Sequence, residues 1–145
     1  MTSLLAWIIR YGHVVSAAVW VGGYALLAFL IVPLLGKGAS EMLVRLSVNA
    51  VRFLTYTGTL TIAFGLILIT RTRGFDHLFG TTWGSLVLVA LLIAIILLGI
   101  GDGALRPALR KSPATGNARV RQWAIIGFVL TVIAVGVMTG ATYVG

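Results

Sequence analysis

The chain has 145 residues, of which 59% are hydrophobic and 10% are charged, with eleven Lys and Arg against three Asp and Glu. Soluble domains contain about 25% charged residues, so this composition excludes an ordinary soluble domain. The absence of cysteine excludes disulfides and thiolate metal sites. The basic residues separate apolar runs and form no basic face with aromatic residues between the charges, which argues against nucleic-acid binding.

Four apolar runs follow one another along the chain, at residues 11–35, 53–70, 82–100 and 123–144. Each has the length of a membrane-spanning helix, about 17–25 residues. The sequence therefore predicts one all-α domain over residues 1–145. We expect an integral membrane four-helix bundle in a lipid bilayer, with antiparallel up-down topology.

The connections between the runs carry the local signals of helix ends. Pro33 lies at the end of the first run, where the helix is predicted to stop before the residues GKG at 36–38. Ser40 is a candidate N-cap with Glu41 in the following turn, so the second helix is predicted to begin near Ser40. Residues 71–84 and 101–122 are rich in glycine and polar residues and are predicted to be loops. Asp102 is then an interfacial acid at a helix terminus.

Charge asymmetry predicts the orientation of the four spans. Both termini lie on one side together with the second loop. This side carries three basic residues, Arg10, Arg71 and Arg73. The first and third loops carry eight basic residues on the opposite side. The positive-inside rule places these two loops in the cytoplasm and the termini outside, in a multi-pass protein of the cytoplasmic (inner) membrane.

Small residues indicate where the helices meet, because close backbone approach drives association in lipid. Gly12 and Gly23 mark an edge of the first span, and Gly58 marks the second. Gly136 and Gly140 form a GxxxG spacing in the fourth span. This last pair is interpreted as packing within the bundle or as the seam of a homodimer.

The histidine in the first span is the main candidate for chemistry. His13 shares a helical face with Ser16, Ala17 and Trp20, and Arg10 lies one turn outward. This stripe fits a flat cofactor. The imidazole would ligate a metal, the small residues would allow close approach, and Arg10 would meet peripheral carboxylates. It also fits a histidine hydrogen-bonded to a neighbouring helix, or one that handles protons.

His77, in the second loop, is the only other histidine. Beside Asp76 it is either a solvated polar residue or a second metal ligand, and the topology places it on the same side as His13. No carboxylate pair lies in a span, and two histidines with three acids offer no nucleophile–base set. The sequence therefore favours a carrier or a subunit over an enzyme.

Three segments of the chain resemble one family. They are "HVVSAAVWVGG", "RFLTYTGTLTIAFGLIL" and "FGTTWGSLVLVALLIAIILLGIGDGALRPAL". Together they are similar to the membrane domain of the copper resistance protein D family, in which a histidine precedes an A-x-W-V-G-G-like stretch. The likeness runs from Tyr11 to about Leu130.

This resemblance implies two possible cofactors. Members named for copper are associated with copper movement across the cytoplasmic membrane, which implies copper at His13 and His77. A related branch, the small membrane protoporphyrinogen oxidases, binds heme b through a first-helix histidine that His13 matches. That branch has a third-helix lysine where this chain has Ala90, so the resemblance implies heme b without the oxidase activity. We expect an electron-transfer protein or a subunit of a larger membrane redox complex. A cofactor-free accessory bundle is the third alternative.

Overall fold

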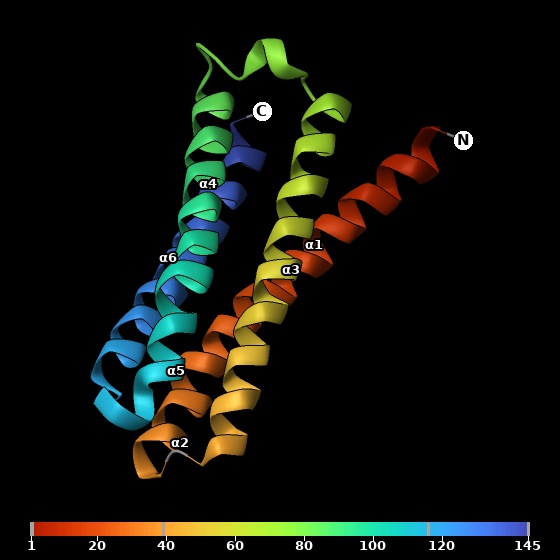
Figure 1. Ribbon diagram of the computed structural model, residues 1–145. Coiled ribbons are helices and arrows are strands. Elements are labelled where there is room, and N and C mark those ends of the chain that lie inside the picture. The colour runs from red at the N-terminus through yellow and green to blue at the C-terminus, as the bar shows by residue number, and fades with distance from the viewer. Residues whose placement is uncertain (1, 39, 116, 145) are drawn as a thin grey trace.

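The computed structural model describes residues 2–38, 40–115 and 117–144, with side chains except those of residues 2 and 112–115. Among these residues, four helices are long and apolar enough to cross a membrane. They span Ser3–Lys37, Glu41–Arg71, Thr82–Lys111 and Ala118–Tyr143. Antiparallel neighbours form a bundle; α6 ends near the connection between α3 and α4, and α1 begins toward the same end but displaced to the side (Figure 1). The predicted all-α membrane-type bundle is therefore confirmed.

The first and third of these helices are each built from three segments. The first comprises α1 (Thr2–Leu26), a π-helical turn η1 (Leu27–Ile31) and α2 (Val32–Lys37). The third comprises α4 (Thr82–Gly99), a π-helical turn η3 (Ile100–Leu105) and α5 (Arg106–Thr115). The second and fourth are the single helices α3 (Glu41–Arg71) and α6 (Ala118–Tyr143), and a short 3-10 turn, η2 (Phe75–His77), lies between α3 and α4.

Side-chain caps set two of the helix starts. The Ser40 hydroxyl accepts the backbone N–H of Leu43 at 3.2 Å, which confirms the predicted start of α3. The Thr81 hydroxyl accepts the backbone N–H of Gly84 at 3.0 Å at the start of α4. A side chain at Gly84 would collide with the backbone carbonyls of the preceding loop. Local geometry thus accounts for Thr81 and Gly84 in the stretch "FGTTWG" at the start of the third helix.

The loop predicted over residues 101–122 is wrong for most of its length. Residues 101–115 continue the third helix and α6 begins at Ala118, while residue 116 lies outside the described part of the chain. Gly101 and Gly103 lie within the turn η3 and do not end the helix. Asp102 is therefore inside a helix and not at a terminus.

The first helix ends at Lys37, close to the stop predicted after Pro33, but it continues for four residues past the proline. Proline removes one backbone donor from a helix and crowds the preceding turn. Pro33 and Pro107 are each the second residue of an α-segment that directly follows a π-helical turn. The wider turn makes room for the ring, so each helix continues past its proline.

The helices are arranged as two pairs, with the main core toward one end and a smaller cluster of Ile69, Leu78 and Val87 at the other. Helix α1 packs most extensively on α3, and α4 on α6. The main core joins the pairs through residues from Trp20 to Leu35 of the first helix and from Ile93 to Leu109 of the third. Helix α1 leans away from its neighbours toward its N-terminus (Figure 1). The tightest packing therefore lies in the half of the bundle that is remote from the termini.

Tyr24 is the side chain at the centre of this core. It is 1% exposed, and its hydroxyl donates to the backbone carbonyl of Leu97 on α4 at 2.9 Å. Its ring lies against Gly127 of α6, where a Cβ atom would overlap it. One residue of α1 thereby contacts both helices of the other pair.

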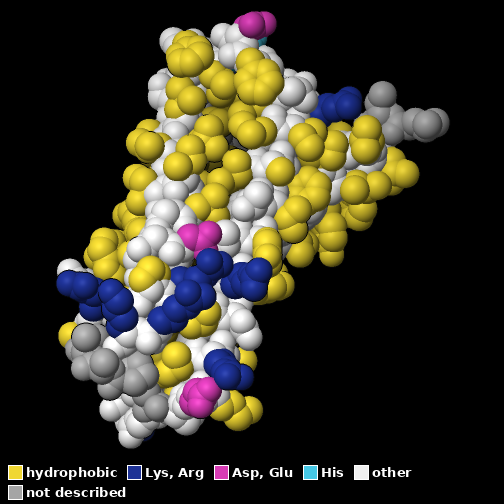
Figure 2. All heavy atoms as spheres, viewed as in Figure 1, with side chains coloured by type: hydrophobic (Ala, Val, Ile, Leu, Met, Phe, Trp, Pro, Cys, Tyr) yellow, Lys and Arg dark blue, Asp and Glu magenta, His cyan; other side chains and the backbone are white. Residues whose placement is uncertain are grey.

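The outer surface of the bundle is apolar over most of its length. In the apolar windows of the four helices, 22–39% of the residues are buried inside the protein. Many Leu, Ile, Val and Phe side chains therefore point outward, which suits lipid as the surrounding medium. Figure 2 shows Lys and Arg gathered toward the end that carries α2 and α5. We call this end the basic end; its eight basic residues are Lys37, Arg45, Arg52, Arg106, Arg110, Lys111, Arg119 and Arg121.

Of the glycines predicted to mark helix contacts, Gly12 lies in such a contact and Gly136 does not. A Cβ at Gly12 would meet the Phe64 ring at 2.8 Å, so this position lies on the α1–α3 contact. Gly136 is exposed, and no described atom lies within 4 Å of the Cβ position there. Gly140 is partly buried, and its Cβ position lies 3.8 Å from the Leu86 Cδ1 of α4, so only Gly140 of the GxxxG pair packs within the bundle.

Candidate functional site

His13 lies on α1 against α3 and is partly buried. Its Nδ1 lies 2.9 Å from the backbone carbonyl oxygen of Thr61. The imidazole covers Gly65, where a Cβ would be 3.1 Å from the His13 Cε1. A carbonyl can only accept, so Nδ1 donates the proton of this bond, and in the neutral tautomer that fits the bond Nε2 carries no proton. No hydrogen-bond partner of Nε2 lies among the described residues.

This geometry gives His13 the outer-shell support of a metal ligand. A ligating imidazole usually donates its second ring N–H to a carbonyl or carboxylate, which fixes the tautomer and the ring orientation. The Thr61 carbonyl provides that acceptor. The same bond also joins α1 to α3 without any metal, so both interpretations from the sequence are compatible with it.

The remaining stripe residues face α3 and are engaged in packing. The Ser16 hydroxyl donates to the carbonyls of Gly12 at 2.7 Å and His13 at 3.1 Å within its own helix. Trp20 is 5% exposed and lies over Gly58 of α3. Ala17 is partly buried between them. A flat cofactor could contact these three positions only if α1 and α3 separated there.

Arg10 is exposed on the outward side of His13. It lines a hollow of about 280 Å³ between α1 and α3, with Arg71 on the opposite wall. Trp7 also lines this hollow and stacks on Tyr11, with ring centroids 5.4 Å apart. The structure thus places Arg71 across this hollow from Arg10, the arginine of the predicted stripe.

Arg71 is a candidate that the sequence did not single out. The predicted topology places Arg10 and Arg71 on the same side of the membrane, and this is the only indication in the sequence that they could lie close together. Their pairing depends on the register of α3 against α1, and the sequence does not specify that register.

His77 lies apart from this group. It is exposed at the end of the turn η2, and its backbone carbonyl accepts the Thr81 hydroxyl at 2.6 Å. Thr61, the partner of His13, lies ten residues before the end of α3 at Arg71, which is about 15 Å of helical rise. Within the described ranges, no cluster of three or more His, Cys, Asp or Glu residues is placed to hold a metal ion.

A second polar group, at the basic end, was also missed. Arg106 pairs with Asp102 at 2.9 Å, and the Thr55 hydroxyl donates to the same carboxylate oxygen at 3.1 Å. The Arg106 Nε is buried without a hydrogen-bond partner among the described residues. The i, i+4 spacing of Asp102 and Arg106 was visible, but the segment had been interpreted as a loop. This group links α3 to η3 and positions the second π-helical turn.

No protein-family model matches the chain, and no curated protein or solved structure shows significant similarity to it. The resemblance to the copper resistance protein D family therefore rests on the sequence motifs alone and stays a prediction.

Proposed function

We propose that the protein is a heme b-binding membrane protein in which His13 is an axial ligand, acting in electron transfer or as a subunit of a larger membrane redox complex. The observation that carries the proposal is the His13 Nδ1–Thr61 carbonyl hydrogen bond. This bond orients the ring and, in the tautomer that donates from Nδ1, leaves the lone pair of Nε2 free to ligate a metal. A bound heme would supply reversible one-electron chemistry at its iron.

The charges around His13 support the same choice of cofactor. Heme carries two carboxylates, and Arg10 and Arg71 line one hollow on the outward side of His13. Guanidinium groups are the preferred partners of carboxylates. The close packing of Ser16 and Trp20 against α3 restricts the cofactor to this outer side. The proposal therefore uses His13, Arg10 and Arg71, and leaves Ser16, Ala17 and Trp20 in the helix contact.

The test is the absorption spectrum of the purified protein and of two His13 variants. We expect a Soret band in the wild type and its loss in His13→Ala. His13→Asn keeps an amide donor for the Thr61 carbonyl but lacks the ligand nitrogen. It should therefore unfold like the heme-free wild type and still lack the Soret band. His77→Ala is the matched control and should leave the spectrum unchanged.

The alternatives give other results in the same experiment. A full Soret band in His13→Ala would refute axial ligation by His13. A colourless wild type that loses stability in His13→Ala but not in His13→Asn would favour the cofactor-free accessory bundle. That second function has its own support in the packed α1–α3 contact. Copper in place of heme would leave the protein without a Soret band and would make copper content depend on His13 and His77.

We place the protein in the cytoplasmic (inner) membrane with the basic end in the cytoplasm. Eight basic residues lie toward that end of the bundle, against three near the termini and the second loop. The hollow with Arg10 and Arg71 then faces the outer side.

We also propose that Gly136 and Gly140 form a homodimer seam. Gly136 is exposed and meets no described atom within 4 Å, so the position is open to a second copy. We expect Gly136→Leu to abolish the dimer in sedimentation experiments without lowering the unfolding free energy of the protomer. Gly22→Leu, at another exposed glycine with no described neighbour within 4 Å, should leave the dimer intact. A wild type that stays monomeric at every concentration would rule out the seam.

A further inference from the structure

A hollow at the basic end lies between the first helix and the start of α6. Its volume is about 520 Å³. Ala28, Val32 and Ile125 line it, with Asn117 and Arg121 nearer the start of α6. The lining is therefore apolar toward the middle of the bundle and polar toward its end.

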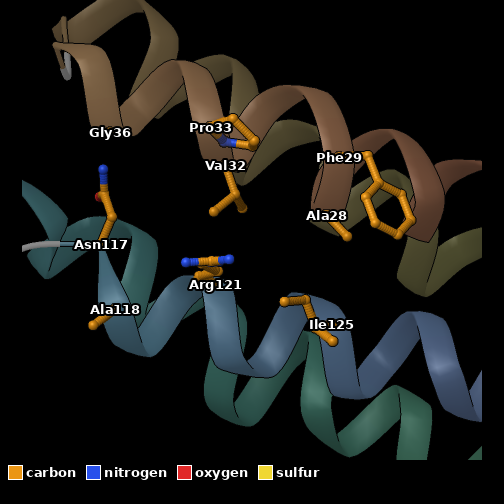
Figure 3. A pocket seen from close by; sticks show the side chains of 9 residues that line it. All are labelled: Ala28, Phe29, Val32, Pro33, Gly36, Asn117, Ala118, Arg121 and Ile125. Carbon is orange, nitrogen blue, oxygen red and sulfur yellow. The ribbon is translucent and has the colours of Figure 1, made fainter.

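Arg121 points into this hollow from α6. Figure 3 shows its guanidinium between the two helices, facing Val32. The Asn117 amide extends from the same helix toward Gly36, where a Cβ would lie 3.8 Å from Nδ2. No hydrogen bond or ion pair of the Arg121 side chain is formed within the described part of the chain. The hollow thus contains a cation whose donors are available to a ligand.

The surrounding charge favours an anion. The basic end carries eight Lys and Arg and two acids. Both acids are already paired within their own helices, Glu41 with Arg45 at 3.0 Å and Asp102 with Arg106 at 2.9 Å. No acidic residue lines the hollow.

We propose that this hollow binds an anionic glycerophospholipid from the surrounding membrane. Its phosphate meets the Arg121 guanidinium, and an acyl chain lies along Ala28, Val32 and Ile125. Ile125 is one helical turn from Arg121, about 6 Å deeper along α6. The change from polar to apolar lining along the helix therefore matches the change from headgroup to acyl chain.

The lining also distinguishes a lipid from free phosphate. Inorganic phosphate would use Arg121 but would leave the apolar walls formed by Phe29, Val32 and Ile125 without a partner. A lipid covers the walls and the cation together, so the structure favours an amphipathic anion.

The test is native mass spectrometry of the full chain in detergent, titrated with dioleoyl phosphatidylglycerol or dioleoyl phosphatidylcholine. We expect the wild type to prefer phosphatidylglycerol, and Arg121→Gln to weaken its binding about fivefold, as the loss of one near-surface cation predicts. Arg119→Gln is the matched control. Arg119 is exposed on the same helix but does not line the hollow, so its binding should be unchanged.

A second variant tests the apolar walls. Ile125 is 38% exposed, so Ile125→Trp can be accommodated and should fill the groove, lowering phosphatidylglycerol binding while the charge is unchanged. Circular dichroism checks that both variants remain helical. Equal binding of the two lipids, equal losses in Arg121→Gln and Arg119→Gln, or full competition by inorganic phosphate would each overturn the proposal. A peptide or a second copy that occupies the hollow in place of lipid would do the same.

Discussion

Replacing Tyr24 with alanine is expected to lower the free energy of unfolding by about 3–5 kcal/mol, the range for deleting a large buried aromatic ring. The ring is 1% exposed and fills the space beside Gly127 of α6, and its hydroxyl bonds the Leu97 carbonyl of α4. Removing it leaves a cavity where the two helix pairs meet. Reversible unfolding in mixed detergent micelles measures the change.

Tyr24→Phe separates the two contributions of this side chain. It keeps the ring and loses only the hydroxyl, so the expected loss is about 1 kcal/mol. A loss as large as that of Tyr24→Ala would place the stabilisation in the hydrogen bond. A negligible loss in Tyr24→Ala would contradict the central role of this residue in the core.

Gly58→Ala is expected to be the second most damaging of these changes. A Cβ at this position would lie 2.6 Å from the Trp20 Cε2 and 3.0 Å from the Leu98 Cδ2. Trp20 is 5% exposed, so its ring has little space to move. Overpacking of this kind costs about 1–3 kcal/mol, and the same micelle unfolding assay measures it.

Gly22→Ala gives this prediction a control with the opposite sign. Gly22 is exposed in the interior of α1, and no described atom lies within 4 Å of the Cβ position. Alanine there should stabilise the helix by about 0.5–1 kcal/mol, because glycine loses more backbone entropy on folding. If both variants shift stability in the same direction, the close contact between α1 and α3 at Gly58 is wrong.

The candidate site was predicted in part. The apolar context of His13 identified the residue, and one of the interpretations left open by the sequence was a hydrogen bond to a neighbouring helix. That bond is present, with the Thr61 carbonyl as the acceptor. A backbone carbonyl is present at every residue, so no sequence pattern distinguishes this partner. The pairing of Arg10 with Arg71 and the position of Arg121 in its hollow likewise depend on how the helices pack.

The helices themselves follow from the sequence alone. In lipid, no water is present to bond the backbone N–H and C=O groups. An apolar run long enough to cross the membrane therefore forms a helix, in which these groups bond one another. Ser40 determined the start of α3 by local capping. Each of these features depends on neighbours within a few residues, and such features can be inferred from the order of the residues.

Only the tertiary structure decided which helices pair and where Pro33 and Pro107 leave them intact. Breaker residues predict a helix end when no wider turn is available, but both prolines follow π-helical turns. The turn η3 is bonded to α3 through Asp102 and Thr55. The sequence also does not show which face of each helix is buried, because lipid-facing and core-facing positions are both apolar in this chain. Steric fit between helices, as between Tyr24 and Gly127, selects the buried face where hydrophobicity does not.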